Sequence, residues 1–247
     1  MATGQPPPTQ PVKVLKLVDE VPGVKSLYLS YKKKDISYRA GQSFRLYVDP
    51  DVSKNIFHPF STASSPTEDY LLFTTRIREE SSFKQAFRKL LPGNELTIMG
   101  PGPGGLALPD DSSGEVVFLG GGIGITPFRS MAKFATDTGL SHKITLLYSS
   151  KTAEDIVFRS EWKELQERNP NLKVVYTVTR PQEGNPKWNG RIGRIDSDFI
   201  RQNVKEIDRV YFYIAGPPAL ITALGGVLED LKVESQKIQI EAFRGYI

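Results

Sequence analysis

Residues 58–66 of this 247-residue chain offer the most concentrated polar chemistry, because a His-Pro-Phe segment is followed there by hydroxyl side chains. Pro59 holds its own φ at about −65° and biases His58 towards extended backbone, so the course of the segment is partly set. The hydroxyl residues that follow are Ser61, Thr62, Ser64 and Ser65. Each hydroxyl both donates and accepts, so the row can satisfy the polar edge of a flat, heteroatom-rich ring. A polar turn after a strand is the alternative.

A glycine-rich loop at residues 120–127 is the second candidate site. It reads Gly-Gly-Gly-Ile-Gly-Ile-Thr-Pro and joins a short apolar run to a predicted helix. Glycines let a ligand approach the backbone, proline suits the first helical turn, and free amides at a helix N-terminus attract phosphate. The spacing does not match the G-x-G-x-x-G fingerprint. Phosphate binding is expected at Gly121, Gly122, Gly124, Thr126 and Pro127; a flexible strand-to-helix turn is the alternative.

The composition limits the chemistry that the chain itself can supply. It has no cysteine and only two histidines, His58 and His142. This excludes disulfides, thiolate nucleophiles, cysteine-ligated zinc and ordinary iron–sulfur clusters, and a histidine-rich metal site is not expected. Any redox chemistry must therefore use a bound organic cofactor.

The charge of the chain favours anionic ligands or an acidic partner. The net charge is +4 and the pI is near 9.1. Basic residues are scattered apart from the run at residues 32–34, so nucleic-acid binding is not expected. There is no signal-peptide pattern and no apolar run of about 18 residues, so we expect a cytoplasmic protein without a membrane span.

The first half of the chain has the pattern of a small antiparallel β-barrel. Residues 1–11 contain four prolines and no apolar periodicity, which predicts a disordered leader. Short alternating or β-branched runs predict strands over residues 12–18, 24–31, 43–48, 70–78 and 96–99. A helix is predicted over residues 82–91, with Ser81 or Ser82 as its N-cap. These elements predict a barrel domain over residues 12–110.

The second half alternates strands with helices. Strands are predicted over residues 116–119, 144–148, 174–178, 210–215 and 238–243. Helices are predicted over residues 127–136, 159–168 and 217–231, with a short one from Ser197. This repetition predicts an α/β domain over residues 114–247, with a parallel sheet and helices on both faces, after a Gly- and Pro-rich linker. Gly216 and Pro217 then follow the carboxyl end of a parallel strand, where such sheets bind ligands.

These motifs, in this order, resemble those of the ferredoxin–NADP reductase superfamily. The segment from His58 to Ser61 resembles its Arg-x-Tyr-Ser flavin motif, the glycine loop its pyridine-nucleotide motif, and Ala215-Gly-Pro-Pro its Cys-Gly-Pro-Pro. The resemblance implies that Phe60 packs on the flavin ring and that Ser61 binds near flavin N5. His58 replaces the arginine of the family, which weakens the usual contact with the flavin phosphates. The flavin-binding residues of this segment would be His58, Pro59, Phe60, Ser61 and Thr62.

By the same resemblance, the C-terminal segment closes the site. Glu241 and Phe243 match the closing glutamate and the ring-stacking aromatic of the family. Phe243 would then cover the flavin face that nicotinamide must reach. Tyr246 is a competing candidate for this cover, and a core aromatic is the alternative for Phe243. The residues that would take part in catalysis are Ser61, Ala215, Glu241 and Phe243.

The phosphate groups of both nucleotides need further donors. The resemblance places the flavin pyrophosphate near the predicted helix at residue 82; the candidates are Ser82, Lys84, the helix amides and, on the strand before, Arg76. Lys84 replaces the usual Thr or Ser. Thr74 and Phe83 are further cofactor-binding candidates. The coenzyme candidates are Ser149, Lys151, Thr179, Arg180 and Arg191. Thr179-Arg180 resembles the Ser-Arg pair of NADPH-using members, and guanidinium groups suit a 2′-phosphate, so NADP(H) is favoured over NAD(H).

The resemblance implies an FAD-dependent NAD(P)H oxidoreductase. NAD(P)H would pass a hydride to flavin N5, and electrons would leave to a separate acceptor. Ferredoxin, flavodoxin, a haem protein, free flavin, a ferric chelate and a quinone are all candidates; the basic charge suits an acidic redox protein. FMN in place of FAD is one alternative. A non-catalytic flavin- or nucleotide-binding subunit of a larger complex, which transfers electrons or senses redox state, is the other.

Overall fold

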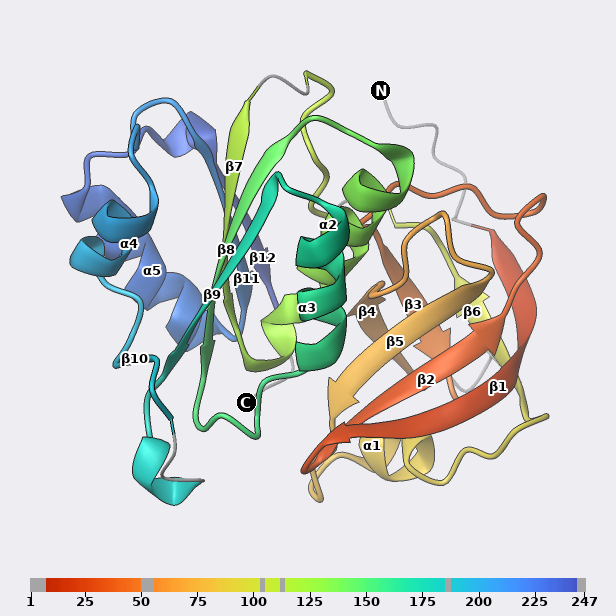
Figure 1. The fold of residues 1–247 in the computed structure, drawn as a ribbon. Helices are drawn as coiled ribbons and strands as arrows, with labels where there is room; N and C mark the ends of the chain where they lie inside the picture. The colour runs from red at the N-terminus through yellow and green to blue at the C-terminus, as the bar shows by residue number, and fades with distance from the viewer. Residues whose placement is uncertain (1–7, 50–55, 103–104, 112–113, 185–187, 244–247) are drawn as a thin grey trace.

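Two β-sheet domains lie side by side in the computed structural model, which describes residues 8–49, 56–102, 105–111, 114–184 and 188–243 (Figure 1). The first domain has an antiparallel sheet, and the second has a parallel sheet between helices. This architecture confirms the predicted fold class. Within the described ranges, no helix combines the length and the apolar character needed to cross a membrane.

The first domain contains six antiparallel strands in the order β4-β3-β6-β1-β2-β5. The strands are β1 (Thr9–Val21), β2 (Val24–Ser30), β3 (Ser43–Tyr47), β4 (Phe57–Ser61), β5 (Tyr70–Arg76) and β6 (Glu95–Met99). The sheet curls round until the chain after β4 reaches β5, where the Ala63 N–H donates to the Leu72 carbonyl across 2.8 Å. Buried rings fill the space inside, among them Phe44, Phe73 and Phe87.

Two local predictions for this domain are wrong. Residues 9–11, assigned to a disordered leader, begin β1 and pair with β6; residues 1–7 lie outside the described ranges. The partner strand is distant in the sequence, so the local composition does not reveal the pairing. Helix α1 (Ser82–Phe87) ends before residue 91, because the backbone tightens after Phe87 and Pro92 follows. Its N-cap is Ser81, whose Oγ accepts from the Lys84 N–H at 3.3 Å.

The second domain contains six parallel strands in the order β10-β9-β8-β7-β11-β12. The strands are β7 (Glu115–Gly121), β8 (Lys143–Ser150), β9 (Leu172–Val178), β10 (Arg191–Ile192), β11 (Tyr211–Gly216) and β12 (Ile238–Ala242). The helices are α2 (Thr126–Thr138), α3 (Arg159–Arg168), α4 (Ser197–Asn203) and α5 (Pro218–Asp230). Helices α2 and α3 cover one face of the sheet, and α4 and α5 cover the other (Figure 1).

The strand order reverses between β7 and β11, the neighbouring strands at the centre of the sheet. Such a reversal opens a crevice at the carboxyl ends of the strands, and ligands bind there in sheets of this kind. The glycine loop, which forms the 3-10 helix η2 (Gly122–Ile125), and Gly216 both lie at this edge. Gly124 packs so closely on the Ala215 carbonyl that a Cβ atom would overlap it. Glycine is therefore required at position 124.

One apolar cluster runs across the contact between the domains. It joins Ala63 and Leu72 of the first domain to Ile123, Met131 and Trp162 of the second, all of them buried. Removal of this apolar surface from water stabilises the contact. The two sheets therefore have a fixed relation at the place where the carboxyl edge of the parallel sheet faces β4 and β5.

Two glycine substitutions in the second domain should act in opposite directions. Gly226→Ala in α5 should raise the free energy of unfolding by about 0.5–1 kcal/mol, because the position is helical and exposed and has open space for a Cβ atom. Gly124→Ala should lower it by about 1–3 kcal/mol through overpacking. Thermal unfolding measures both changes against the parent protein. A lower midpoint for Gly226→Ala would contradict the prediction.

Candidate functional site

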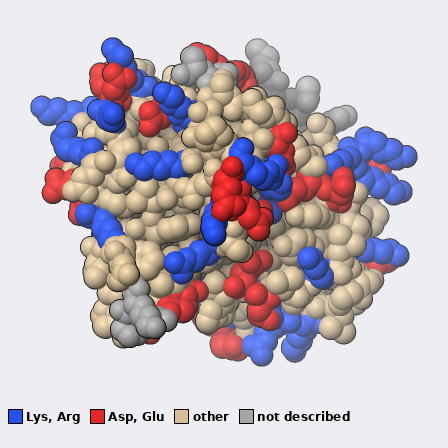
Figure 2. Space-filling model, viewed as in Figure 1, with Lys and Arg blue, Asp and Glu red and all other residues tan. Residues whose placement is uncertain are grey.

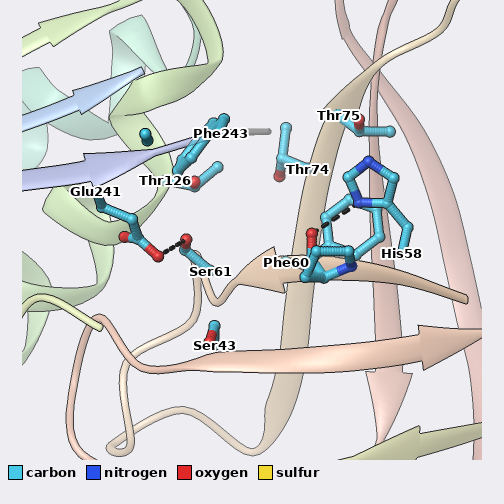
Figure 3. A pocket seen from close by; sticks show the side chains of 11 residues that line it. Ser43, His58, Phe60, Ser61, Thr74, Thr75, Thr126, Glu241 and Phe243 are labelled. Carbon is cyan, nitrogen blue, oxygen red and sulfur yellow. Dashed lines mark hydrogen bonds between the residues drawn. The ribbon is translucent and has the colours of Figure 1, made fainter. Parts of the chain in front are cut away.

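A pocket, here called the first pocket, lies at the contact between the two domains (Figure 3). Its walls come from β3, β4 and β5 of the first domain and from α2 and the end of β12 of the second. The residues that line it are Ser43, His58, Pro59, Phe60, Ser61, Thr74, Thr75, Thr126, Glu241, Ala242 and Phe243. The fold thus brings the predicted flavin segment together with the predicted closing residues from the other end of the chain.

A serine and a glutamate form a hydrogen-bonded pair in the first pocket. The Ser61 hydroxyl donates to Glu241 Oε1 across 2.7 Å, whereas Glu241 Oε2 is buried without a hydrogen-bond partner among the described residues (Figure 3). Burial raises the pKa of Glu241 to about 7, against the lowering effect of the Ser61 hydrogen bond. The carboxyl group can therefore hold or release a proton near neutral pH.

Strand β12 positions the aromatic ring at the mouth of the first pocket. It pairs with β11 so that Glu241 lies opposite Ala215, and the Phe243 N–H then donates to the Gly216 carbonyl at 2.9 Å. This bond holds Phe243 on the pocket wall. Ala215, predicted to take part in catalysis, is instead fully buried in the sheet and does not line the pocket. Tyr246, the competing aromatic, lies outside the described residues.

The charge beside the flavin motif belongs to Lys84 rather than to His58. Burial, with Lys84 nearby, lowers the pKa of His58 to about 4, so the imidazole is neutral at pH 7. Lys84 is 4% exposed, and its Nζ donates to Thr75 Oγ1 at 2.5 Å and lies 4.5 Å from the centre of the Phe60 ring. Burial, assisted by the charge of Arg78, lowers the pKa of Lys84 to about 7. An anion next to this ammonium group would compensate its buried charge.

Three other residues of the predicted flavin-binding set do not line the first pocket. Phe83 is buried in the aromatic core next to Phe60, and Ser82 is exposed and does not line the pocket. Thr62 is fully buried, and its backbone N–H and its hydroxyl both donate to the Gln42 carbonyl, at 3.0 and 3.1 Å. Of these three side chains, none contacts the first pocket.

The row of hydroxyls after Phe60 does not line one ligand, contrary to the expectation. Ser61 faces the first pocket, but Ser64 and Ser65 are fully buried. The Ser64 carbonyl accepts from the Ser130 hydroxyl of α2 at 2.6 Å. The reason is that the chain turns after β4 and joins β5 through Ala63, so the later side chains pack between the domains.

A second pocket opens beside the glycine loop at the carboxyl edge of the parallel sheet. The residues that line it are Arg76, Arg78, Gly121, Gly122, Ile123, Ser149, Ser150, Lys151, Asp155, Thr179, Pro217 and Leu220. Seven of them were predicted cofactor contacts: Arg76, Gly121, Gly122, Ser149, Lys151, Thr179 and Pro217. Gly124 and Pro127 do not line it, because Gly124 packs on β11 and Pro127 belongs to the buried first turn of α2.

Arg76 lies in the second pocket rather than beside the flavin segment. Its Nη2 is 3.7 Å from Asp155 Oδ1, and its Nη1 donates to the Pro22 carbonyl at 3.3 Å. Thr74, two residues before Arg76 on β5, lines the first pocket. Its Oγ1 is 2.6 Å from Ser26 Oγ. Strand β5 therefore forms part of both pockets, and the assignment of Arg76 to the flavin phosphates is not supported by its position.

Arg180 and Arg191 lie near the second pocket without lining it. The Arg180 N–H donates to the Lys151 carbonyl at 2.8 Å, and β10 places Arg191 beside the end of β9. Both side chains already have carboxylate partners, Glu183 at 3.3 Å and Asp196 at 2.5 Å. A 2′-phosphate would have to exchange with these carboxylates.

Both pockets also contain residues that the sequence motifs did not indicate. Ser43 and Thr75 line the first pocket, and Asp155 lines the second. Asp155 follows β8 in a polar loop, a position that the carboxyl-edge rule points to. Ser43 and Thr75 lack such a signal, since they differ from other strand hydroxyls only in the side they face. No group of residues suited to hold a metal ion occurs among the described residues.

Comparison with known proteins finds one matching domain family and solved structures of the same fold. Residues 118–225 match the oxidoreductase NAD-binding domain family. A ferredoxin–NADP⁺ reductase from Neisseria gonorrhoeae, solved with FAD and NADP, superposes with a TM-score of 0.78 over 95% of this chain and 98% of its own, at 21% identity. The chain therefore shares the fold of this reductase. An Amycolatopsis cytochrome P450 reductase superposes with a TM-score of 0.81 over 96% of this chain and 71% of its own, at 22% identity.

The curated relatives of the chain are oxidoreductases of more than one kind. A component of the Na⁺-translocating NADH-quinone reductase from Idiomarina loihiensis is 26% identical over 88% of this chain. The chain spans 57% of the length of that component. NADH-cytochrome b5 reductase 2-A from Vanderwaltozyma polyspora is 29% identical, and the match covers 81% of this chain and 67% of the relative.

Glu241→Gln should change how stability depends on pH. The folded-state pKa of Glu241 is raised from 4.5 to about 7, so the folded protein binds a proton that the unfolded chain releases. The contribution of Glu241 to stability therefore falls as pH rises through this window and is lowest above it. The variant lacks this titration. Its thermal midpoint relative to the parent should be higher at about pH 8 than at about pH 5; equal differences would contradict the prediction.

Proposed function

We propose that this chain is an FAD-dependent NAD(P)H oxidoreductase that passes electrons to a separate acceptor. The observation that carries the proposal is the first pocket, where the Ser61–Glu241 pair lies between aromatic walls next to the glycine loop. The second pocket adjoins it, because β5 contributes Thr75 to one and Arg76 to the other. A ring in the first pocket and a nucleotide in the second would meet where Thr126 begins α2.

The residues of the first pocket fit a flavin ring. Phe60 and Phe243 offer aromatic surfaces, and Ser61 and Thr126 offer hydroxyl groups. The unpartnered Oε2 of Glu241 is an acceptor that a ring N–H would satisfy. A flat ring with a polar edge needs this combination of apolar walls and a few polar groups. When bound, the flavin supplies the redox chemistry, because it accepts a hydride and releases electrons.

The side chains of the pocket have separate tasks in this proposal. Phe243 covers the ring and swings aside for nicotinamide; stacking is worth only ~0.5–1.5 kcal/mol beyond burial, so it is readily displaced. The Ser61 hydroxyl donates to Glu241 Oε1 and fixes the carboxyl group, and the pKa of about 7 lets Glu241 itself give up or take back a proton. Gly216 anchors Phe243 and thereby sets the approach of the two rings, and such alignment can supply ~7–11 kcal/mol of a barrier.

We propose that Lys84, Ser82 and the first N–H groups of α1 bind the flavin phosphates. Arg76 is proposed to bind the coenzyme instead of the flavin phosphates. The support for Lys84 is its buried ammonium group, which contacts the pocket residues Phe60 and Thr75. Among the described residues, no carboxylate is near enough to shift its pKa. The support for Arg76 is its place between the glycine loop and Lys151.

We propose NADPH rather than NADH as the preferred coenzyme. Lys151 and Thr179 line the second pocket, and Arg180 and Arg191 stand close to it, so a 2′-phosphate would meet several cations. The names of both curated relatives mention NADH, so the preference has to be measured rather than transferred.

The acceptor is proposed to be a separate redox protein or small oxidant. The relatives named above are a component of a quinone reductase and a cytochrome b5 reductase, which supports the quinone and the haem protein among the candidates. Ferredoxin, flavodoxin, free flavin and ferric chelates stay candidates as well. Figure 2 shows Lys and Arg mixed with Asp and Glu on the face in view, so an acidic partner would bind through a local basic surface rather than the net charge. The cytoplasmic location stays a prediction.

Lys84→Met should weaken the binding of flavin nucleotides selectively. Loss of one charge-assisted contact should lower FAD and FMN affinity by about 10- to 100-fold and leave riboflavin affinity unchanged. Quenching of flavin fluorescence by the cofactor-free protein measures all three. Lys89 is an exposed lysine of the same segment, so Lys89→Met is the matched control. An equal loss for riboflavin would show that Lys84 shapes the pocket rather than binding phosphate.

Anaerobic stopped-flow mixing with NADPH and with NADH tests the function itself. Flavin absorbance should bleach with both coenzymes and faster with NADPH, and Arg180→Met should slow the NADPH reaction more than the NADH reaction. Equal rates with the two coenzymes would remove the case for a 2′-phosphate site. Absence of bound flavin, or of bleaching by either coenzyme, would reject the enzyme and favour a non-catalytic binding subunit.

A further inference from the structure

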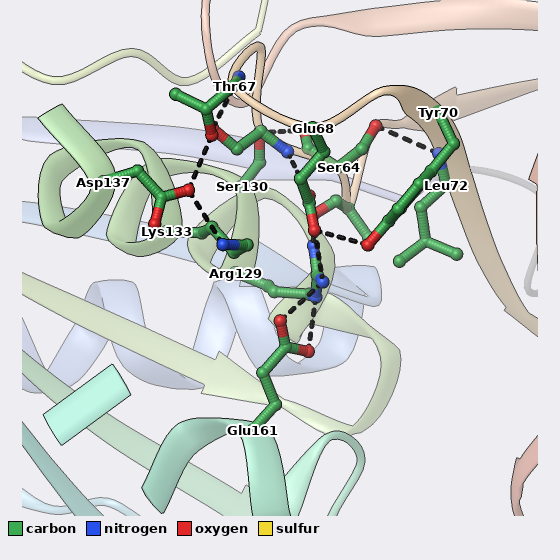
Figure 4. A network of polar contacts seen from close by, with 12 residues as sticks. Ser64, Thr67, Glu68, Tyr70, Leu72, Arg129, Ser130, Lys133, Asp137 and Glu161 are labelled. Atoms are coloured by element: carbon green, nitrogen blue, oxygen red, sulfur yellow. Dashed lines mark hydrogen bonds and ion pairs between the residues drawn. The ribbon is translucent and has the colours of Figure 1, made fainter. Parts of the chain in front are cut away.

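A buried arginine in the first turn of α2 connects the two domains (Figure 4). Arg129 Nη1 donates to the Ala63 carbonyl at 2.6 Å and to Glu68 Oε2 at 2.9 Å, and Nη2 donates to Glu68 Oε1 at 3.0 Å. These acceptors belong to the first domain. Its Nε and Nη2 also donate to Glu161 of α3, at 2.7 and 2.5 Å. All five N–H groups of the guanidinium therefore have acceptors.

The electrostatics of this cluster make its geometry specific. Arg129 is 3% exposed. Burial alone would raise the pKa of Glu68, but the hydrogen bonds and charge of Arg129 hold it below its usual value. Glu68 also accepts the Ser65 N–H at 2.8 Å and the Tyr70 hydroxyl at 2.5 Å. A buried charge with this many directed partners tolerates little displacement, because each lost bond leaves an unpaired polar group in the interior.

The cluster is close along the chain to residues of both pockets. Thr126, three residues before Arg129 on the same helix, lines the first pocket, and the glycine loop before it forms the second. Ala63, which accepts from Arg129, comes two residues after Ser61 of the first pocket. Ser130, the residue after Arg129, adds a second link between the domains. Its hydroxyl donates to the Ser64 carbonyl at 2.6 Å and accepts the Gly41 N–H at 3.0 Å.

We propose that Arg129 is a positioning residue for hydride transfer, which holds the glycine loop and Thr126 at a set distance from Ser61 through its contacts with Ala63 and Glu68. The inference rests on the proposed function. It assigns Arg129 no contact with flavin or coenzyme. Its loss should therefore misalign two bound rings without weakening the binding of either.

Arg129→Met and Arg129→Lys test this role, with Lys133→Met as the matched control. Lys133 lies one turn further along α2 and is bonded to Asp137 of the same helix at 2.8 Å. Arg129→Met should slow flavin reduction at saturating NADPH by about 10- to 100-fold. The coenzyme and flavin dissociation constants should stay within about twofold of the parent values. Arg129→Lys should recover part of the rate, since it keeps the charge but loses the fork of donors.

If Arg129→Met folds poorly, Ser130→Ala and the control Lys133→Met still test the role. Lys133→Met should leave the rate unchanged, and Ser130→Ala, which removes only the second link, should show a smaller loss of the same kind. Weaker coenzyme binding with an unchanged rate in any Arg129 variant would overturn the proposal. Unchanged rate and unchanged binding would overturn it as well.

Hydrogen exchange of the cofactor-free protein separates this inference from the proposed function. The Ser65 amide is bonded to Glu68, so it should exchange at least about tenfold faster in Arg129→Met and at the parent rate in Lys133→Met. Equal exchange in the two variants would overturn the positioning role. If the parent protein is not reduced by NADPH or NADH, the proposed function fails, whereas the exchange result still reports whether Arg129 holds the segment.

Discussion

The buried guanidinium of Arg129 is the interaction on which the site depends. Arginine cannot shed its charge in a protein, so each N–H that folding removes from water needs an acceptor. Those acceptors come from the segment between β4 and β5 and from α3, so α2 is correctly bonded only when both domains are in place. Breaking such a buried ion pair typically costs about 3–5 kcal/mol, far more than an exposed pair contributes.

The centre of the parallel sheet sets the second constraint. Because the strand order reverses between β7 and β11, their following loops diverge and leave a crevice between them. Gly124 packs on the Ala215 carbonyl and closes the bottom of this crevice, and β12 runs along β11 until Phe243 is bonded to Gly216. The C-terminal ring reaches the first pocket because a strand at the sheet edge carries it there. Its position is therefore a result of the topology.

Desolvation shifts three titratable groups in and beside the first pocket towards their neutral forms. Burial lowers the pKa of His58 to about 4 and that of Lys84 to about 7, and it raises the pKa of Glu241 to about 7. Groups with such values change charge at low cost when a charged ligand or a proton arrives. A phosphate next to Lys84 and a proton at Glu241 are each compatible with this environment. The same environment disfavours a permanently charged side chain at position 58, where the family motif has arginine.

Local sequence patterns were enough to predict the architecture and the parts of the site that lie in continuous motifs. Short strand patterns mark the antiparallel domain, and strand patterns that alternate with helical ones mark the parallel domain. Both can be read from the sequence because strand and helix periods are local properties. The glycine loop could likewise be assigned from its residues, and the flavin segment and the closing glutamate from their resemblance to a family. In contrast, tertiary contacts bury Lys84, turn Arg76 towards the second pocket and pack Ser64 against α2. These positions could not be predicted, because the side that a residue faces depends on contacts with segments distant in the chain, and no local pattern contains them.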